Sequence, residues 1–173
     1  ARLDGHPAEL ASSKRAKHDA IATRIQTSTR QDVGFVTSYG KIHRIHAADV
    51  PGFGEVFDAG QAVSAHDFLG LPKDELILTV IELNETAELA LGTEQGVVKR
   101  VVADYPAKDE FEIISLKDGD RVVGAALATD ASTLVFVSSD AQLLHYSASS
   151  VRPQGRPAGG VAGINLDEAA KVI

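Results

Sequence analysis

The stretch Glu88–Val101, ELALGTEQGVVKRV, predicts a β-hairpin. Its first half carries the apolar residues Leu89 to Leu91 and its second half a run of valines, which favours strands on both sides of a polar turn. Gly96 stands where such a turn needs a residue that accepts a positive φ angle. A single hairpin is marginally stable in water, so the question is whether the pattern recurs.

The pattern recurs twice. Residues 32–45 read DVGFVTSYGKIHRI, with Gly40 in the position of Gly96. Residues 133–146 read TLVFVSSDAQLLHY, with Ala141 in the same position. Three copies of one hairpin indicate a repeat architecture, in which each unit buries its apolar face against the next.

Each hairpin belongs to a longer unit, in which one apolar strand precedes the hairpin and another short strand follows after a loop of variable length. The expected first strands are Ala20–Ile25, Leu76–Leu83 and Val122–Leu127, and the expected last strands are Ala62–Ala65, Glu112–Leu116 and Val161–Leu166. About four short strands per unit, repeating every ~40–50 residues, are typical of propeller blades.

The sequence therefore predicts an all-β, propeller-like fold of about three four-stranded blades plus the start of a fourth. The expected units are residues 17–72, 73–117 and 118–168, with a partial unit at 169–173. Residues 1–16 are interpreted as a linker or the remnant of a preceding blade. Because the chain has no methionine and stops inside a fourth unit, we expect a fragment that forms an incomplete or open arc.

Composition limits the possible functions. The 173 residues suit one domain, and the lack of cysteine excludes disulfides and thiolate metal sites. No apolar run approaches the ~20 residues of a membrane span, and no signal peptide is visible, so we expect a cytoplasmic protein without a membrane partner.

The net charge of −7 repels nucleic acid on average, but the charges are unevenly distributed. From Lys14 to Arg44 the chain has seven lysines and arginines against two acids. From Asp49 to Glu94 it has ten acids against Lys73 alone. The average charge thus hides a basic stretch followed by an acidic one.

No catalytic constellation is evident. His43 and His46 are three residues apart on an expected strand, so they point to opposite faces and form a poor metal chelate. The glycines at 159, 160 and 163 are not followed by the Gly-Lys-Ser/Thr of a phosphate-binding loop, and there is no Gly-x-Ser-x-Gly elbow. We expect no catalytic residues, no metal and no cofactor in this chain.

The three hairpins and the stretch Val151–Leu166, VRPQGRPAGGVAGINL, resemble the C-terminal domain of the A subunits of bacterial type IIA topoisomerases, DNA gyrase and topoisomerase IV. The latter stretch is similar to the family's blade loop Arg-Pro-x-Gly-Arg-x-x-x-Gly-Val-x-Gly-Ile. The basic box of gyrase, Gln-Arg-Arg-Gly-Gly-Lys-Gly, is absent, and the nearest stretch, Gln154–Gly160, holds one positive charge. This departure favours a topoisomerase IV-like protein or a divergent member of the family.

The resemblance implies a β-pinwheel, in which neighbouring blades exchange strands and an outer rim binds and bends duplex DNA. It also implies a non-catalytic domain of an ATP-dependent type II topoisomerase, located with the nucleoid. Its partners would be duplex DNA, the ATPase B subunit, and the rest of the A subunit.

The candidate DNA-binding residues are cations at or near the expected rim. Alternation along the second strand of each hairpin gives Arg44 and Arg100 equivalent positions, with His145 in the third copy. The full set is Lys14, Arg15, Lys17, Arg24, Lys41, Arg44, Lys99, Arg100, Arg152 and Arg156. No base-reading element is evident, so contacts should be mainly to phosphates.

Two alternatives remain open at this point. Arg44 and Arg100 could pair with acids of adjacent blades, and the basic cluster around Lys14 could be a solvated surface run. The net charge of −7 and the missing basic box also leave open a propeller-like protein–protein interaction module without nucleic-acid binding.

Overall fold

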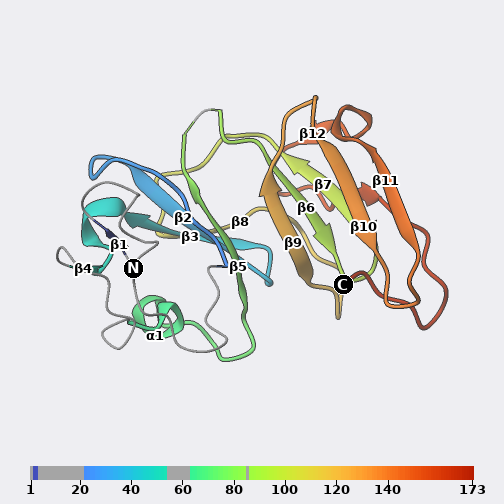
Figure 1. The fold of residues 1–173 in the computed structure, drawn as a ribbon, viewed down its shortest axis with the longest axis horizontal. Coiled ribbons are helices and arrows are strands. Elements are labelled where there is room, and N and C mark those ends of the chain that lie inside the picture. The colour runs from blue at the N-terminus through green and yellow to red at the C-terminus, as the bar shows by residue number, and fades with distance from the viewer. Residues whose placement is uncertain (1, 4–21, 54–62, 85) are drawn as a thin grey trace, which may run out of the picture.

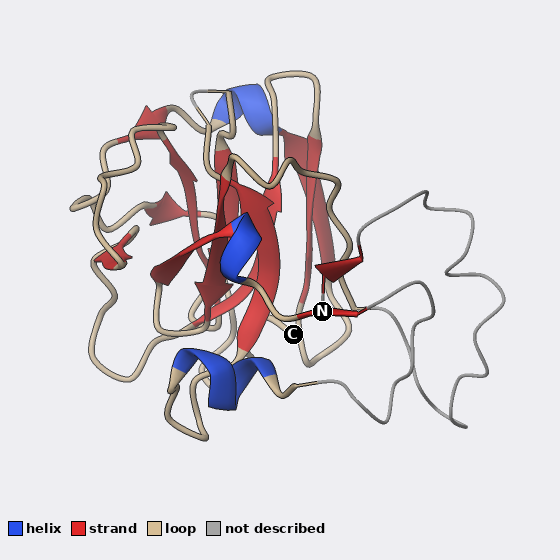
Figure 2. Ribbon diagram, turned by 90° about the vertical axis from the view of Figure 1, so that its left-hand side faces the viewer, coloured by secondary structure: helices blue, strands red, loops and turns tan. Residues whose placement is uncertain are grey.

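The computed structural model describes residues 2–3, 22–53, 63–84 and 86–173, and in these the fold is nearly all β (Figures 1 and 2). The all-β, propeller-like fold class is confirmed. The strands are β1 Arg2–Leu3, β2 Asp32–Thr37, β3 Lys41–His46, β4 Gly52–Phe53, β5 Ile77–Glu82, β6 Leu89–Thr93, β7 Val97–Val101, β8 Glu110–Glu112, β9 Val122–Leu127, β10 Thr133–Val137, β11 Leu143–Ser147, β12 Pro153–Gln154 and β13 Val161–Ala162. Helical segments are α1 Ala65–Leu69 and the 3-10 turns Ala47–Asp49 and Ala148–Ser150.

The three predicted hairpins are present as the antiparallel pairs β2–β3, β6–β7 and β10–β11. Their turns share one geometry, because Gly40, Gly96 and Ala141 all have positive φ angles of 70°, 84° and 65°. Ala141 is the only residue other than glycine with a positive φ among the described residues. The repeat inferred from the turn positions is therefore a repeat of backbone conformation.

Each complete sheet combines strands from two successive units. One sheet has the order β5-β2-β3-β8, so the hairpin of the first unit is flanked by strands of the second. The next has the order β12-β7-β6-β9, with β13 also on β7, so the hairpin of the second unit is flanked by strands of the third. This exchange of strands is the β-pinwheel arrangement that the resemblance implied, and the units follow one another along the long axis (Figure 1).

The third hairpin carries only the beginning of an equivalent partner. Ser138 forms a bridge with Val172, and the amide of Ile173 donates to the carbonyl of Val137 at 3.0 Å. Thr93 of the second hairpin pairs with Val122 at the corresponding place. Residues 171–173 therefore lie where β9 begins in the preceding sheet.

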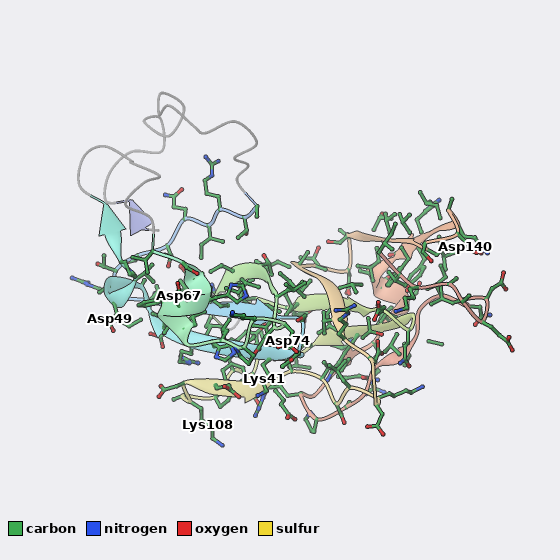
Figure 3. All side chains as sticks on the ribbon, turned by 90° about the horizontal axis from the view of Figure 1, so that it is seen from below. Lys41, Asp49, Asp67, Asp74, Lys108 and Asp140 are labelled. Atoms are coloured by element: carbon green, nitrogen blue, oxygen red, sulfur yellow. The ribbon has the colours of Figure 1, made fainter. Side chains whose placement is uncertain are left out.

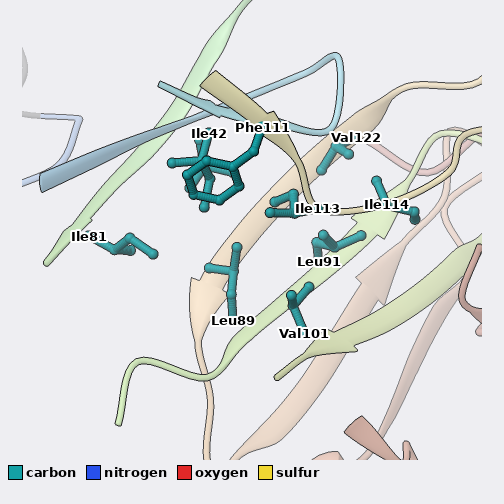
Figure 4. Close-up of a cluster of buried hydrophobic side chains, with 10 residues drawn as sticks. Ile42, Ile81, Leu89, Leu91, Val101, Phe111, Ile113, Ile114 and Val122 are labelled. Carbon is teal, nitrogen blue, oxygen red and sulfur yellow. The ribbon is translucent and has the colours of Figure 1, made fainter. Parts of the chain in front are cut away.

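The main core fills the space between the two complete sheets (Figure 4). Ile42 comes from the first hairpin and Leu89 and Leu91 from the second, and the segment after β8 adds Ile113 and Ile114. All five are at most 2% exposed. Full burial of one such side chain contributes about 1.5–3 kcal/mol, so this cluster fixes the two sheets against each other.

Two expected strands are wrong, and a third, Glu112–Leu116, overlaps β8 only at Glu112. The expected last strand of the first unit is Ala62–Ala65, and its described residues, 63–65, lead into α1 instead. The start of α1 is capped by the Ser64 hydroxyl, which accepts from the amide of Asp67. Gly70 ends the helix in the left-handed conformation, with φ 66°. The described part of Ala20–Ile25, residues 22–25, is not a strand. β5 and β9 each pair with the hairpin of the preceding unit, and no such hairpin precedes residue 22 among the described residues.

Most of residues 1–16 lies outside the described part of the chain. Of these residues the structure describes Arg2 and Leu3, which form β1 and pair in parallel with β4 of the first unit. The linker interpretation and the proposed unit boundaries stay predictions.

The turn residues differ in what packs on them. A Cβ added to Gly96 would stand 2.7 Å from the carbonyl oxygen of Ile164, and one added to Gly40 would stand 2.5 Å from Cγ2 of Ile114. In both units a later segment of the chain closes over the turn. Ala141 is exposed, so its methyl group meets no such cover among the described residues.

We predict that Gly96→Ala lowers the free energy of unfolding by about 2 kcal/mol or more, because it combines a left-handed alanine with a clash against backbone. The reverse change, Ala141→Gly, should leave stability within about 1 kcal/mol of the wild type, in the stabilising direction. Urea denaturation of both variants checks this. Equal destabilisation of the two variants would contradict the role given to the covering segment.

Candidate nucleic-acid interface

The candidate cations fall into three groups in the structure. Lys14, Arg15 and Lys17 lie outside the described residues. Lys99 and Arg100 are buried, at 0% and 2% exposure. The remaining five are half-buried or exposed: Arg24, Lys41, Arg44, Arg152 and Arg156. The expectation that Lys99 and Arg100 reach an accessible rim is therefore wrong.

Arg100 on β7 is held inside the fold by both units that meet there. Its Nη2 donates to Glu88 at 2.7 Å, and its Nη1 donates to Asp130 of the following unit at 2.7 Å. Nη1 also lies 3.1 Å from the carbonyl oxygen of Ala148 and 3.2 Å from that of Val151. Burial opposes the charge, but the two carboxylates raise the pKa of Arg100. The alternative of pairing with acids thus holds for Arg100.

Arg44 makes the corresponding contacts one unit earlier. It pairs with Asp32 across its own hairpin, and its Nη2 donates to the carbonyl of Pro106 at 2.8 Å. His46 also bonds to Asp32 at 2.9 Å, and these partners, His46 first and Arg44 second, lower the pKa of Asp32. Arg44 therefore ties its hairpin to the loop that follows β7, and its acid comes from the same unit rather than from an adjacent one.

Lys99 is the neighbour of Arg100 on β7 and points to the opposite face of the sheet. Its Nζ donates to the carbonyl oxygens of Ile113, Arg156 and Ala158 at 2.9, 2.7 and 2.6 Å. Burial, with the nearby guanidinium of Arg156, lowers the pKa of Lys99 to about 8. A side chain with all three donors used inside the protein has none left for phosphate.

Lys41 on β3 is accessible but neutralised. Its Nζ lies 2.6 Å from Oε1 of Glu110 on β8, and this hydrogen bond raises the pKa of Lys41. His43 lies between Glu75 and Glu110, at 3.3 and 3.7 Å. Glu75 is buried and also accepts from the hydroxyl of Thr37 at 2.5 Å. On this face of the first sheet, Lys41 and His43 are therefore paired with glutamates and do not form a cationic surface.

Arg152 and Arg156 flank β12 and have no carboxylate partner among the described residues. Arg152 is exposed. The Nε of Arg156 donates to the carbonyl of Asp104 at 3.1 Å, and its Cζ lies 5.7 Å from the ring centroid of Phe111. The guanidinium is thus oriented by neutral groups, and its positive charge is not cancelled by an ion pair.

A second loop lies beside this one. The amide of Val102 donates to the carbonyl of Gln154 at 3.1 Å, so residues 102–109 run next to the loop that contains Arg156. Lys108 projects outward from this neighbouring loop (Figure 3). Sequence reasoning did not select Lys108. The pairing of two loops whose facing residues are more than 50 positions apart leaves no local signal in the sequence.

We name residues 102–109 and 152–160 the paired loops. Both lie at the end of β7 that is distant from its turn, because Pro153 and Gln154 pair with Arg100 and Val101. Arg152 and Arg156 lie at this end of the second sheet, whereas the far part of residues 102–109 reaches the first sheet, where the carbonyl oxygen of Asp109 accepts from the amide of Arg44 at 2.7 Å. Other cations without a carboxylate partner among the described residues are Arg24, Arg30, Lys73 and Lys117.

The turn ends of the hairpins are richer in acids. The hydroxyl of Tyr39 donates to Asp74, and the amide of Gln95 donates to Asp120 at 3.0 Å. Glu94 pairs with Arg121 and Lys171. Asp140 projects from the turn of the third hairpin (Figure 3). These acids bond to the turns and to neighbouring cations, so they have a structural role at this end of the hairpins.

The residues that the structure describes include no group of three or more His, Cys, Asp or Glu side chains that could hold a metal ion. No helix within the same residues is long and apolar enough to cross a membrane.

The strand exchange and the repeated hairpins define the class of this protein as a β-pinwheel. A family model described as "DNA gyrase C-terminal domain, beta-propeller" matches residues 112–129 and 132–173. The chain resembles the solved C-terminal domain of DNA topoisomerase IV with a TM-score of 0.74 and 22% identity, over 83% of this chain and 46% of that one. It resembles the E. coli ParC C-terminal domain with a TM-score of 0.70 and 17% identity, over 99% of this chain and 71% of that one.

Among curated relatives, the DNA gyrase A protein of Staphylococcus epidermidis is 28% identical over 162 residues, which is 90% of this chain. The chain spans only 18% of that relative's length. These comparisons confirm the resemblance found in the sequence: the chain is similar to the C-terminal domain of type IIA topoisomerase A subunits, the subunits of DNA gyrase and topoisomerase IV.

We predict that Arg100 stabilises the fold. Arg100→Met should lower the free energy of unfolding by about 3 kcal/mol, because it removes a buried cation that joins two units and leaves Glu88 and two carbonyls unpaired. Asp130→Asn should cost less than about 1 kcal/mol, because Asp130 is 79% exposed and water replaces its partner. Thermal and urea unfolding measure both changes. A neutral Arg100→Met variant would refute the structural role.

Proposed function

We propose that this chain is the DNA-binding C-terminal domain of a type IIA topoisomerase A subunit, and that it contacts duplex DNA through the paired loops. The observation that carries this proposal is the position of Arg152 and Arg156, which lie together on one loop without carboxylate partners among the described residues. Lys108 belongs to the adjacent loop, but to the part that lies next to the first sheet, so the proposed contact has two cations, Arg152 and Arg156. The similarity to the gyrase C-terminal domain supports the choice of ligand.

The contact is to the phosphate backbone. Arginine guanidinium groups match phosphate oxygens in charge and geometry, and no strand or helix of the described residues presents a row of side chains suited to a groove. Two cations correspond to a salt slope of roughly −2, at about −0.9 per phosphate contact. This domain therefore binds DNA weakly by itself and guides or bends a duplex that the rest of the enzyme holds.

In this proposal the domain itself has no catalytic role. The ATPase B subunit, together with the rest of the A subunit, would carry out strand passage, whereas the pinwheel would influence the path of the DNA segment. The protein would work in the cytoplasm, at the nucleoid. Arg24 is exposed and stays a candidate contact, as do Lys14, Arg15 and Lys17.

We predict that the variant R152E/R156E binds duplex DNA more weakly than the wild type for all sequences alike, and with a salt slope shallower by about 2. Fluorescence anisotropy of a short labelled duplex, titrated at several salt concentrations, measures both quantities. The matched control is K73E/K117E, which makes the same change in net charge at residues next to the turns. It should alter affinity only slightly.

Equal losses in the two variants would show that net charge alone matters and would refute the paired loops as the contact. A wild type that binds no duplex at low salt would refute the proposed function itself.

A second candidate function, binding to protein, is favoured by one feature. Val135 and Leu143 on the third hairpin are 57% and 65% exposed, and Val137, which pairs with Leu143, lies on the same face. In the second sheet the corresponding face is covered, because Phe136 packs against Gly92. At the opposite end of the structure, Val33 and Phe35 are covered by Ile25 and by Leu69 of α1.

We predict that this uncovered apolar face makes the isolated chain self-associate at high concentration, and that L143K reduces the association. Sedimentation velocity over a range of concentrations measures it. The control L116K changes a half-buried leucine away from this face. A wild type that stays monomeric throughout would contradict the prediction.

A further inference from the structure

The ammonium group of Lys99 has a role that DNA contact does not explain. The side chain is 0% exposed, and its Nζ lies 2.9, 2.7 and 2.6 Å from the carbonyl oxygens of Ile113, Arg156 and Ala158. An ammonium has three donors, so these three acceptors use all of them. No carboxylate of the described residues pairs with Lys99. Its charge is therefore compensated by backbone dipoles alone.

The three acceptors belong to two separate stretches of chain. Ile113 follows β8, whereas Arg156 and Ala158 belong to the loop between β12 and β13. Lys99 itself lies on β7, beneath both. One side chain thus joins a strand of the second sheet to a stretch of its own unit and to a loop of the next unit.

Backbone packing brings the loop close to this group. The amide of Ser115 donates to the carbonyl of Ala158 at 3.3 Å. Gly160, with φ 82°, lies so close to β7 that an added Cβ would stand 2.7 Å from the carbonyl oxygen of Val98. The loop between β12 and β13 consequently packs closely against β7. The Lys99 ammonium holds the part of this loop that contains Arg156.

Arg156 is held at both ends. Its carbonyl oxygen accepts from Lys99, while its guanidinium is oriented by the carbonyl of Asp104 and the ring of Phe111. Without the ammonium, the oxygens of Ile113, Arg156 and Ala158 would be close together and unpaired by any side chain. The buried carbonyl of Ile113 and the part-buried carbonyl of Arg156 would lose their side-chain donor, and the carbonyl of Ala158 would keep only the amide of Ser115, which favours local opening of the loop.

We propose that Lys99 is a positioning residue for DNA binding: its buried ammonium clamps the Arg156 loop and so holds the guanidinium of Arg156 in place for a phosphate. This inference rests on the proposed function. The clamp is specific to the second unit among the described residues. At the corresponding positions, His43 bonds to carboxylates in the first unit and Leu144 is a half-exposed apolar side chain in the third.

The test compares K99M with T37V. K99M keeps an unbranched side chain of similar length but removes the three donors. T37V removes a buried hydrogen bond to Glu75 in the first unit, so it controls for a loss of stability remote from the loop. Hydrogen exchange of the amides in residues 155–160 reports the clamp. Salt-dependent binding to a short duplex reports the positioning of Arg156.

In K99M we expect exchange in residues 155–160 to rise more than tenfold and the salt slope to become shallower by about 1, with roughly tenfold weaker binding at low salt. T37V should leave loop exchange and the slope unchanged. Unchanged loop exchange in K99M overturns the clamp. Faster loop exchange with an unchanged slope overturns its link to DNA binding.

A wild type that binds no duplex would refute the proposed function, and the exchange measurement would still decide whether the clamp exists. If K99M does not fold, the wild type provides the second measurement. A nitrogen-15 spectrum of the lysine side chains should show the ammonium of Lys99 protected from exchange with water. Its absence overturns the clamp.

Discussion

The structure depends on strand exchange between successive units. β2 of the first unit pairs with β5 of the second over Val33↔Glu82 to Thr37↔Ile77, and β6 of the second unit pairs with β9 of the third in the same way. A hairpin on its own exposes two edges and an uncovered face. Here the following unit supplies both the missing strands and the cover, so each unit completes its predecessor. The contacts of Arg44 and Arg100 lie along these joints, because each arginine also bonds to carbonyl oxygens of the following unit.

The three hairpins could be predicted because their signal is local. The turn requires a positive φ at one position, and the flanking residues show the composition of strands, so Gly40, Gly96 and Ala141 mark the same place in each copy. The last strands could not be predicted with the same accuracy. Ser64 and Gly70 supply a helix start and end that override a strand in the first unit, and β12 pairs in parallel with β7 across more than 50 residues of sequence.

The sequence could predict which cations occupy equivalent positions in the repeats, but not which of them are buried or paired. Alternation along a strand correctly assigns Arg44 and Arg100 to equivalent positions, but it cannot show that Asp130 or the carbonyl of Pro106 lies beside them. Arg44 and Arg100 recur most regularly in the sequence, yet both bond to partners within the fold and have a structural role. The cations free of acids are less regular: they lie on loops whose neighbours are fixed only by the fold. The cations of the proposed DNA contact are therefore different residues from the cations that hold the sheets together.

The order of the strands along the chain has a consequence for how this protein can be divided. The sheet β5-β2-β3-β8 needs residues 32–46, 77–82 and 110–112, and the sheet built on β6 and β7 needs residues 89–101 and 122–127 as well as β12. The two sets interleave, so no single cut of the polypeptide leaves both sheets whole. The repeat seen in the sequence is therefore not a detachable part. Fragments, proteolytic cuts and chimaeras whose boundaries follow the sequence repeats would each remove strands from a sheet. The two sheets should therefore fold and unfold together as one cooperative unit.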